Sequence, residues 1–400
     1  MTSKERMLAA MEYKETDYVP CSFMIFFNMF NHSKSEAEFV EKQLELGLDA
    51  YAHVGHLKHS FHPDVKYSEW VEEEKSEKFF CRKIDTPKGP LTQRIKQSNN
   101  WPYEGNFPIF NDWLITRAKE VLVKPEEDLE KLKYFFGPFK DEGINKLRET
   151  ATAAKKLADK HGILQLGGWK SSIDIGMVPE TRGNSDGGVA GGDCMAWLSG
   201  YEDVMILSLT KPEIIKEYAN IIAEWNARQI EVYLDVTDAD IIWKRAWYET
   251  TEFWTPDAYK NIIAPVIKKE AEIIHQAGKK FGYILTSAFL PVIDDLLGTG
   301  IDVLVGLDPE EGKGTDFGIV KEKFTAQKAA IWGGVSGAIT IEQGTAKETE
   351  DAVAEAFETL AKDGGFILSP VDNIRDDTQQ AWDNTKVFID AWKKHRDNKY

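Results

Sequence analysis

Cysteine is scarce in this chain of 400 residues. It occurs three times, as Cys21, Cys81 and Cys194, and no two cysteines have the Cys-x-x-Cys spacing. This usage gives no disulfide framework, and it is typical of proteins that work in a reducing compartment. We therefore expect a cytoplasmic protein.

Long apolar runs are also missing. No stretch approaches the ~20 apolar residues that a membrane span needs. The first residues, MTSKERMLAAMEYKETDYVP, lack the apolar centre of a signal peptide. With 42% hydrophobic and 29% charged residues, the composition is that of a soluble globular protein with material for a large core. We expect no contact with a membrane.

Positive charge is in deficit. The chain has 49 Lys and Arg residues against 66 Asp and Glu residues, which gives a formal net charge of −17 at pH 7. Nucleic acid is therefore not an expected partner, because phosphate binding needs clustered Lys and Arg. A multiply anionic substrate is also disfavoured unless its pocket is locally basic.

What the sequence does contain is an alternation of apolar strands with amphipathic helices. The expected helices are an N-terminal one capped by Thr2 or Ser3, and those near residues 36–47, 143–160, 192–235, 256–277, 289–299, 316–324, 346–363 and from 378. The expected strands start near residues 19, 49, 163, 239, 280, 301, 330 and 366. Apolar, β-branched strands separated by helices indicate a parallel sheet. Eight of them are enough for an α/β fold of the (β/α)8 TIM-barrel type, which can use ~250 to more than 400 residues as one domain.

Two segments interrupt the alternation. Residues 66–99 alternate in the manner of strands and contain a Pro-Lys-Gly turn, which predicts a β-hairpin insertion. Residues 169–193 are a long glycine-rich loop, and loops of this length are usually lids, binding loops or disordered. We expect residues 1–400 to form a single barrel domain that carries both segments.

Seven segments, in order and over nearly the whole chain, resemble the uroporphyrinogen decarboxylase (URO-D) superfamily. They are KERMLAAMEYKETDYVP, TPKGPLTQ, LSGYEDVMILSLTKPEIIKE, FWTPDAYKNIIAPVIKKEAEIIHQAGKK, GTGIDVLVGLDPE, WGGVSGAITIEQGTAKETEDAV and GGFILSPVDNIRDDT. The resemblance implies a (β/α)8 barrel and one of two chemistries. One is porphyrinogen decarboxylation, and the other is methyl transfer between a small methylated compound, a corrinoid protein and a thiol.

The sequence departs from the decarboxylases after the first strand. Those enzymes carry an Arg-Gln-Ala-Gly-Arg run that binds substrate carboxylates, whereas this chain has Ile25-Phe26-Phe27-Asn28-Met29. A substrate with many carboxylates is not held by a phenylalanine pair, because each unpaired buried carboxylate is costly. The resemblance therefore does not favour a porphyrinogen as the substrate.

The sequence also departs from the branch that methylates thiols. That branch binds zinc through His-x-Cys after the fifth strand and a later Cys, where this chain has Thr286, Ala288 and Asp372. Zinc activates a thiol only when enough soft or borderline ligands hold the metal. What remains resembles the substrate-side methyltransferases, which pass a methyl group to cob(I)alamin on a separate corrinoid protein. We expect a corrinoid-dependent methyltransferase whose donor is a small methylated compound, in first place a methoxylated aromatic.

Active sites of such barrels lie at the carboxyl ends of the strands. After the fourth strand come Trp247, Tyr248 and Glu249, with Trp254 close behind. Aromatic surroundings raise the pKa of a glutamate, so Glu249 is the expected general acid, supported by Tyr248. The alternative is a salt-bridged loop residue.

The last strand ends in Ser-Pro and is followed by a polar cluster. Pro370 stiffens this exit, after which Asp372 is a third catalytic candidate and Asn373 a substrate-binding one. Thr378 or a neighbouring aspartate can cap the final helix, which accounts for part of the cluster without any function.

Five further residues are candidates for binding the substrate. Asn28 and Phe27 follow the first strand, where the alternative is core packing, and Trp169 could stack on a planar ring. Tyr283 would bind a leaving oxygen if its hydroxyl points inward. Asp308 closes the sixth strand, although Asp-Pro is also a good turn start.

Four histidines follow the second strand with a spacing of three: His53, His56, His59 and His62. Such a spacing can bring imidazoles to a metal ion, so His53 and His56 are conceivable ligands and zinc stays open. Hydrogen-bonded loop histidines are the alternative. His56 has the best chance of facing the substrate.

Two other functions remain open. A decarboxylase or lyase of a smaller acid could use Arg375 or Lys170 for the carboxylate, and a binding protein could keep the barrel without catalysis. Cys194 begins a helix, and a structural role is expected for it. The sequence does not fix whether the chain forms a homodimer.

Overall fold

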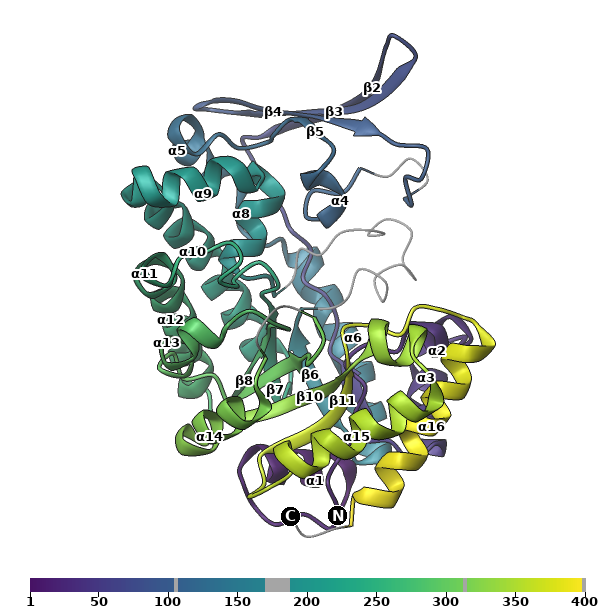
Figure 1. Ribbon diagram of the computed structural model, residues 1–400. Coiled ribbons are helices and arrows are strands. Elements are labelled where there is room, and N and C mark those ends of the chain that lie inside the picture. Colours follow the sequence, from purple (N-terminus) through teal and green to yellow (C-terminus); the bar gives the residue numbers. More distant parts are fainter. Residues whose placement is uncertain (104–106, 170–187, 312–314, 398–400) are drawn as a thin grey trace.

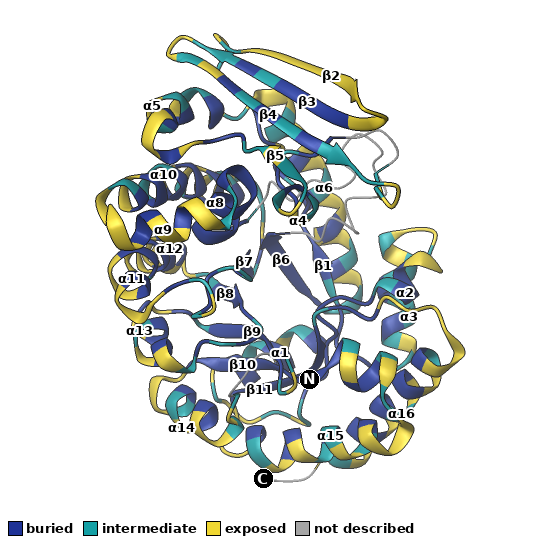
Figure 2. Ribbon diagram, turned by 45° about the horizontal axis from the view of Figure 1, so that its top comes forward, coloured by how far each residue is buried: buried dark blue, intermediate teal, exposed yellow. Residues whose placement is uncertain are grey.

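The centre of the molecule is a curled parallel sheet with helices packed around its outside (Figures 1 and 2). The structure is a computed structural model that describes residues 1–103, 107–169, 188–311 and 315–397. The sheet has seven strands in the order β1-β6-β7-β8-β9-β10-β11. Their bounds are β1 (Tyr51–His53), β6 (Leu164–Gly168), β7 (Ile241–Arg245), β8 (Lys280–Ile284), β9 (Val303–Leu307), β10 (Ala330–Ser336) and β11 (Phe366–Val371). Seven of the eight predicted strands are thereby confirmed.

The first predicted strand is not a strand. Cys21 forms a single parallel bridge with Leu368 of β11, through Ser22 N–H to Leu368 O at 3.0 Å and Leu368 N–H to Pro20 O at 2.9 Å. Pro20 has no N–H to continue a ladder, so the apolar run around it does not pair further. The described sheet is therefore one of seven strands, where eight were expected.

The predicted helices are present with shifted ends. Those around the parallel sheet are α1 (Ser3–Met11), α2 (Phe27–Asn31), α3 (Glu36–Glu45), α6 (Asp141–His161), α8 (Gly191–Ser199), α9 (Tyr201–Thr210), α10 (Pro212–Val236), α11 (Pro256–Ala258), η2 (Tyr259–Ile263), α12 (Ala264–Gln276), η3 (Leu290–Val292), α13 (Ile293–Leu297), α14 (Phe317–Gln327), η4 (Gly337–Gln343), α15 (Ala346–Leu360) and α16 (Gln379–His395). The helix expected over 192–235 is three helices, because Gly200 has φ +72° and Pro212 starts a new one. Each helix of the described residues is too short or too polar to span a bilayer.

A second sheet of four antiparallel strands covers one end of the molecule (Figure 1). It consists of β2 (Lys66–Glu74), β3 (Glu77–Thr86), β4 (Gly89–Gln97) and β5 (Ala118–Glu120), with α5 (Pro125–Phe135) beside it. All nine residues of the edge strand β2 are exposed, including Trp70 (Figure 2). The short helix α4 (Asp112–Ile115) lies between this sheet and the parallel one, which brings Asp112 toward the parallel strands.

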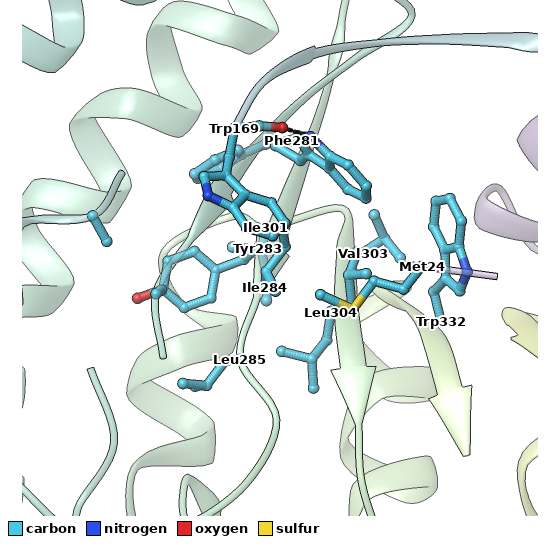
Figure 3. Close-up of a cluster of buried hydrophobic side chains, with 14 of the residues drawn as sticks. Met24, Trp169, Phe281, Tyr283, Ile284, Leu285, Ile301, Val303, Leu304 and Trp332 are labelled. Atoms are coloured by element: carbon cyan, nitrogen blue, oxygen red, sulfur yellow. Dashed lines mark hydrogen bonds between the residues drawn. The ribbon is translucent and has the colours of Figure 1, made fainter. Parts of the chain in front are cut away.

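Aromatic side chains fill the inside of the curled sheet. The rings of Tyr51 and Trp243 are 5.5 Å apart, and Trp332 lies 6.1 Å from each of them. The indole nitrogens are satisfied, since Trp243 donates to Trp169 O at 2.6 Å and Trp332 donates to Ser22 O at 2.7 Å. Buried tryptophans usually find such partners. Figure 3 shows Trp332 next to Met24, with Trp169 above them. These rings form a rigid floor beneath the carboxyl ends of the strands.

At Gly168 there is no room for a side chain. It ends β6 with φ +96°, and a Cβ there would lie 2.2 Å from the carbonyl oxygen of Trp243. We expect Gly168→Ala to lower the free energy of unfolding by about 2 kcal/mol or more, because both strain and overlap oppose the folded state. Urea unfolding checks this.

The matched control is Gly143→Ala in α6, where a Cβ would meet nothing within 4 Å. Because alanine is the better helix former, we expect this variant to gain about 0.5–1 kcal/mol. Equal effects of the two substitutions would show that the space around Gly168 is not restrictive.

Candidate functional site

The carboxyl edge, meaning the carboxyl ends of the parallel strands and the residues directly after them, is organised around Arg245. This residue ends β7 and is buried. Its Nη1 pairs with Asp193 of α8, and its Nη2 bonds both carboxylate oxygens of Asp112 at 2.9 and 3.0 Å. The ring of Trp247 lies 4.2 Å from the guanidinium carbon. Both terminal nitrogens of Arg245 are therefore engaged by carboxylates of the protein.

Tyr248 is tied to the same group. Its hydroxyl donates to Asp112 Oδ1 at 2.6 Å, and Trp197 Nε1 donates to that oxygen at 2.8 Å. Burial opposes the charged form of Asp112, but Arg245 and these hydrogen bonds outweigh it and hold its pKa below the ordinary value. Burial and the charge of Asp112 raise the pKa of Tyr248. Tyr248 is thus a neutral hydrogen-bonding group at neutral pH.

Asp193 is the less well compensated carboxylate. It is fully buried between Arg245 and the backbone N–H of Tyr248, which donates to Oδ2 at 3.0 Å. Burial raises the pKa of Asp193 to about 7, with Arg245 opposing the shift and Glu249 adding to it. Because one guanidinium neutralises two carboxylates, Asp193 binds a proton more easily than an ordinary aspartate does.

Glu249 and Tyr283 lie behind the sheet rather than at the carboxyl edge. Glu249 accepts the N–H of Gly192 at 2.8 Å and the hydroxyl hydrogen of Tyr283. In the ladder Tyr283 pairs with Lys244, whose ammonium bonds Glu270 of α12 at 2.5 Å. Side chains of paired residues share a face of the sheet, so both point toward the helices.

This position corrects two expectations. Strand alternation places Gly282 and Ile284 inside the sheet, so the hydroxyl of Tyr283 points away from Met24 and Trp332 (Figure 3). Burial raises the pKa of Glu249 as expected, but the carboxyl group bonds the first turn of α8 and Tyr283 on the outer side of the sheet.

Asp308 directly follows β9 and is only 1% exposed. Its Oδ1 accepts the N–H groups of Glu310 and Glu311 at 2.8 and 2.9 Å, so the turn that Asp-Pro predicts is present. Its Oδ2 is buried and makes no hydrogen bond. Burial raises the pKa of Asp308, and the two N–H groups and the hydroxyl of Ser336 oppose the shift. The side chain therefore stabilises the turn after β9 and contacts the end of β10.

Asp372 and Asn373 follow β11 in the same way. Asp372 has φ +59°, its Oδ1 is buried without a partner, and Arg375 lies 3.4 Å from its Oδ2. Asn373 accepts the backbone N–H of Phe27 at 3.3 Å through Oδ1, while its Nδ2 is buried without a partner. A positive φ in a residue other than glycine is often found at functional sites.

An aromatic pocket lies between β1, β6, β7 and the segment around Met24 and Phe26. Its cavity volume is about 30 Å³, within about 500 Å³ of empty space that includes open solvent. It is lined by Met24, Ile25, Phe26, Phe30, Glu36, Phe39, Tyr51, His53, Trp169 and Trp243. Trp169 thus borders a pocket as the sequence predicts, but Phe26 rather than Phe27 lines it. The aromatic lining is of the kind that stacks on planar groups, but a cavity of this size holds a water molecule or two, so a ring would enter only after these side chains move.

His53 and Asn28 hold the backbone around this pocket. His53 Nδ1 accepts the N–H of Gly55 at 3.1 Å, so Nε2 carries the proton that bonds Trp169 O at 2.9 Å. Asn28 is fully buried and bonds Asp376 O at 3.2 Å and the N–H of Met29 at 2.8 Å. Both side chains thus bond the backbone of the protein, and His53 also lines the pocket.

The other predicted residues lie outside the pocket lining or outside the described residues. His56 is half-buried outside the pocket lining, and Cys194 is buried in α8. Lys170 and most of the glycine-rich loop lie outside the described residues. Within the described ranges no group of three His, Cys, Asp or Glu side chains could hold a metal ion. We therefore assign no step to zinc.

The sequence does not single out Arg245, Asp112 or Asp193. A weak signal exists for Arg245, since a charged residue ends the apolar strand IIWKR. Asp112 has no local signal, because it reaches the carboxyl edge only through the packing of α4.

Comparisons with known proteins agree with this architecture. A sequence model of the uroporphyrinogen decarboxylase (URO-D) family matches residues 193–395. A methyltransferase from Methanosarcina mazei has a similar structure, with a TM-score of 0.58 and 15% identity over 98% of this chain and 99% of that chain. A B12-independent methionine synthase from Shewanella sp. W3-18-1 is more distant, with a TM-score of 0.42 and 8% identity over 94% and 97% of the two chains. No curated protein matches by sequence. At these identities the structural likeness concerns the fold alone.

The buried carboxyl of Glu249 should make stability depend on pH. Because its pKa is raised in the folded state, the stabilisation it gives is complete below the ordinary glutamate pKa and is lost as pH rises toward the raised value. We expect Glu249→Gln to gain stability relative to the parent protein as pH increases from 4 to 8. Urea unfolding across this range measures the difference.

Glu348 provides a control of opposite sign. It caps α15 through Thr345, and hydrogen bonds from Thr345 lower its pKa. Glu348→Gln should therefore lose stability relative to the parent at pH 8, and the loss should shrink as pH falls. Parallel pH profiles for the two variants would contradict the buried position of Glu249.

Proposed function

The chain belongs to the uroporphyrinogen decarboxylase (URO-D) family, and from this we propose that it removes a methyl group from a small methylated compound and passes it to the corrinoid of a separate protein. The donor we propose is a methoxylated aromatic. The observation that carries the proposal is a pocket lined by aromatic rings together with a half-buried carboxyl, Asp372 after β11, whose Oδ1 has no partner. The fold shared with a methyltransferase supports it.

Arg245 argues against decarboxylation of a polycarboxylate. A carboxylate clamp needs a guanidinium with free donors, and those of Arg245 already bond Asp112 and Asp193. Arg375, a second arginine that the described residues place near the carboxyl edge, has a side chain that is 60% exposed, which weakens any ion pair it makes.

We also propose that the residues around Cys21 complete a (β/α)8 barrel. Cys21 bridges Leu368 of β11, and its carbonyl accepts the N–H of Asp49 at 2.7 Å just before β1. The segment thus touches both edge strands of the seven-stranded sheet. In such a barrel, the carboxyl edge is the surface on which active sites are built.

Breaking a methyl–oxygen bond leaves the electron pair on oxygen, and that oxygen then needs a proton. When bound, the corrinoid of the partner supplies the nucleophile for the methyl carbon. In our proposal, the pocket widens on binding, and Trp169 and Trp243 then hold the ring and exclude water. Asp372, whose pKa is raised by burial, donates the proton. Tyr248 stays neutral and, because its hydroxyl hydrogen bonds Asp112, it positions that carboxylate at the carboxyl edge.

Methyl transfer can be measured directly. We expect the purified chain, mixed with a cob(I)alamin-loaded carrier protein, to form methylcobalamin from at least one methoxyarene. Omission of the chain is the control. No product from methoxyarenes, methylated amines or methylated sulfides would contradict the proposal, and release of carbon dioxide from small acids would favour a lyase instead.

The role of Asp372 predicts a dependence on the leaving group. Asp372→Asn keeps the shape and tolerates the positive φ but has no proton to donate. We expect the single-turnover rate with 4-methoxyphenol to fall about 10²–10⁴-fold. With 4-methoxybenzonitrile, whose phenoxide is stable without a proton, the fall should be much smaller. An equal fall with both donors would show that Asp372 does not act as the acid.

A further inference from the structure

The aromatic pocket is closed, and one of its two walls is fixed. Tyr51, His53, Trp169 and Trp243 lie on parallel strands or directly after one, and the backbone ladders hold them in place. A cavity of about 30 Å³ has no room for a ring beside this wall. Entry of a ring therefore requires movement of the opposite wall.

The opposite wall is the segment that leads into α2. Phe26 directly precedes this helix and Phe30 lies within it, and both line the pocket. Met24 is bound to the sheet, because its N–H donates to Ser369 Oγ at 3.0 Å and its carbonyl accepts the hydroxyl hydrogen of Tyr51 at 2.7 Å. The part of this wall that can move is therefore α2 together with Phe26.

Hydrogen bonds join α2 to the loop that follows β11. The N–H of Phe27 donates to Asn373 Oδ1 at 3.3 Å. Asn28 donates twice, through its backbone N–H to Ile374 O at 3.0 Å and through Nδ2 to Asp376 O at 3.2 Å. Because Asn28 is fully buried, breaking these bonds without a replacement costs free energy. A displacement of α2 therefore pulls the loop with it.

An exposed pair of side chains completes this connection. His32 directly follows α2 and bonds Asp377 at 2.8 Å, and both side chains are more than half exposed. Exposed pairs of this kind contribute little free energy. A substitution of His32 should therefore loosen α2 without disturbing the core.

We propose that α2 is the movable wall of the aromatic pocket, and that its hydrogen bonds to the loop make Asn28 a positioning residue for Asp372. Asp372 directly precedes this loop, and its φ of +59° is a conformation that only the surrounding backbone maintains. A ring that displaces α2 shifts the loop, and with it the carboxyl group of the proposed acid. This inference rests on the proposed function and adds the connection between pocket and acid.

Hydrogen exchange of the chain alone tests the connection. His32→Ala should speed exchange of the peptides that cover residues 24–33 and 370–378 by the same factor, about twofold to fivefold, because one opening exposes both. His275→Ala is the matched control, since His275 of α12 also bonds an aspartate, Asp302, at 2.8 Å, and it should change neither peptide. Faster exchange in one peptide alone, or in neither, would overturn the proposal.

Binding of a ring tests the movable wall. If the closed form cannot bind, His32→Ala should bind 4-methoxyphenol more tightly than the parent protein does, by the factor that exchange gives. Calorimetry without any corrinoid measures both affinities. Equal affinities would show that the ring enters by another route and would overturn the role of α2. Absence of binding to both proteins would contradict the proposed substrate, while the exchange result still decides the connection.

The positioning role of Asn28 has a readout of its own. Asn28→Ala should slow single-turnover methyl transfer from 4-methoxyphenol about tenfold and leave transfer from 4-methoxybenzonitrile nearly unchanged, because only the first donor needs the acid. An equal loss with both donors would indicate a structural defect and overturn the positioning role. If this variant does not fold, His32→Ala should show the same difference with a smaller size.

The proposed reaction and this inference can fail separately. Absence of methyl transfer from both donors in the parent protein would contradict the reaction, and exchange would still show whether α2 and the loop open together.

Discussion

One arginine joins three parts of the molecule that are distant in sequence. Arg245 ends a central strand, bonds Asp193 at the start of α8, and bonds Asp112 on α4, 133 positions away. Moving the charges of Arg245 and its two aspartates out of water costs free energy. The hydrogen bonds between them and the contact with Trp247 offset this cost only when all of them are present. Loss of any one partner would leave a charge buried and unpaired. The position of α4, and with it Tyr248, depends on this contact.

Much of the fold could be predicted from the sequence because its signals are local. Each central strand is apolar over its whole length, and helix ends carry caps such as Thr345 or stops such as Gly162. The exception near residue 20 is an apolar run whose proline cannot extend a ladder. In the region 192–235 the helical pattern of the sequence continues through Gly200. The positive φ of Gly200, which ends α8 before α9, becomes evident in the backbone geometry.

The site could be predicted only where it follows the strands directly. The structure places Asp308, Asp372 and Asn373 at the carboxyl edge, where the sequence predicts them, because the carboxyl ends of parallel strands meet at one edge. Tyr283 is misplaced because a shift of one residue in a strand reverses the face of a side chain, and the register with Lys244 cannot be read from sequence. Asp112 arrives through tertiary packing of a distant helix, which leaves no local pattern.

The edge strand β2 has a consequence for how the protein is handled. Nine exposed residues with Trp70 and Val71 near the middle would be a template for pairing with a second chain. Glu72, Glu73 and Glu74 at its end keep two such edges apart by repulsion. Acidic buffers remove that repulsion, so concentrating or storing the protein at low pH invites aggregation through this strand even while the rest of the molecule stays folded.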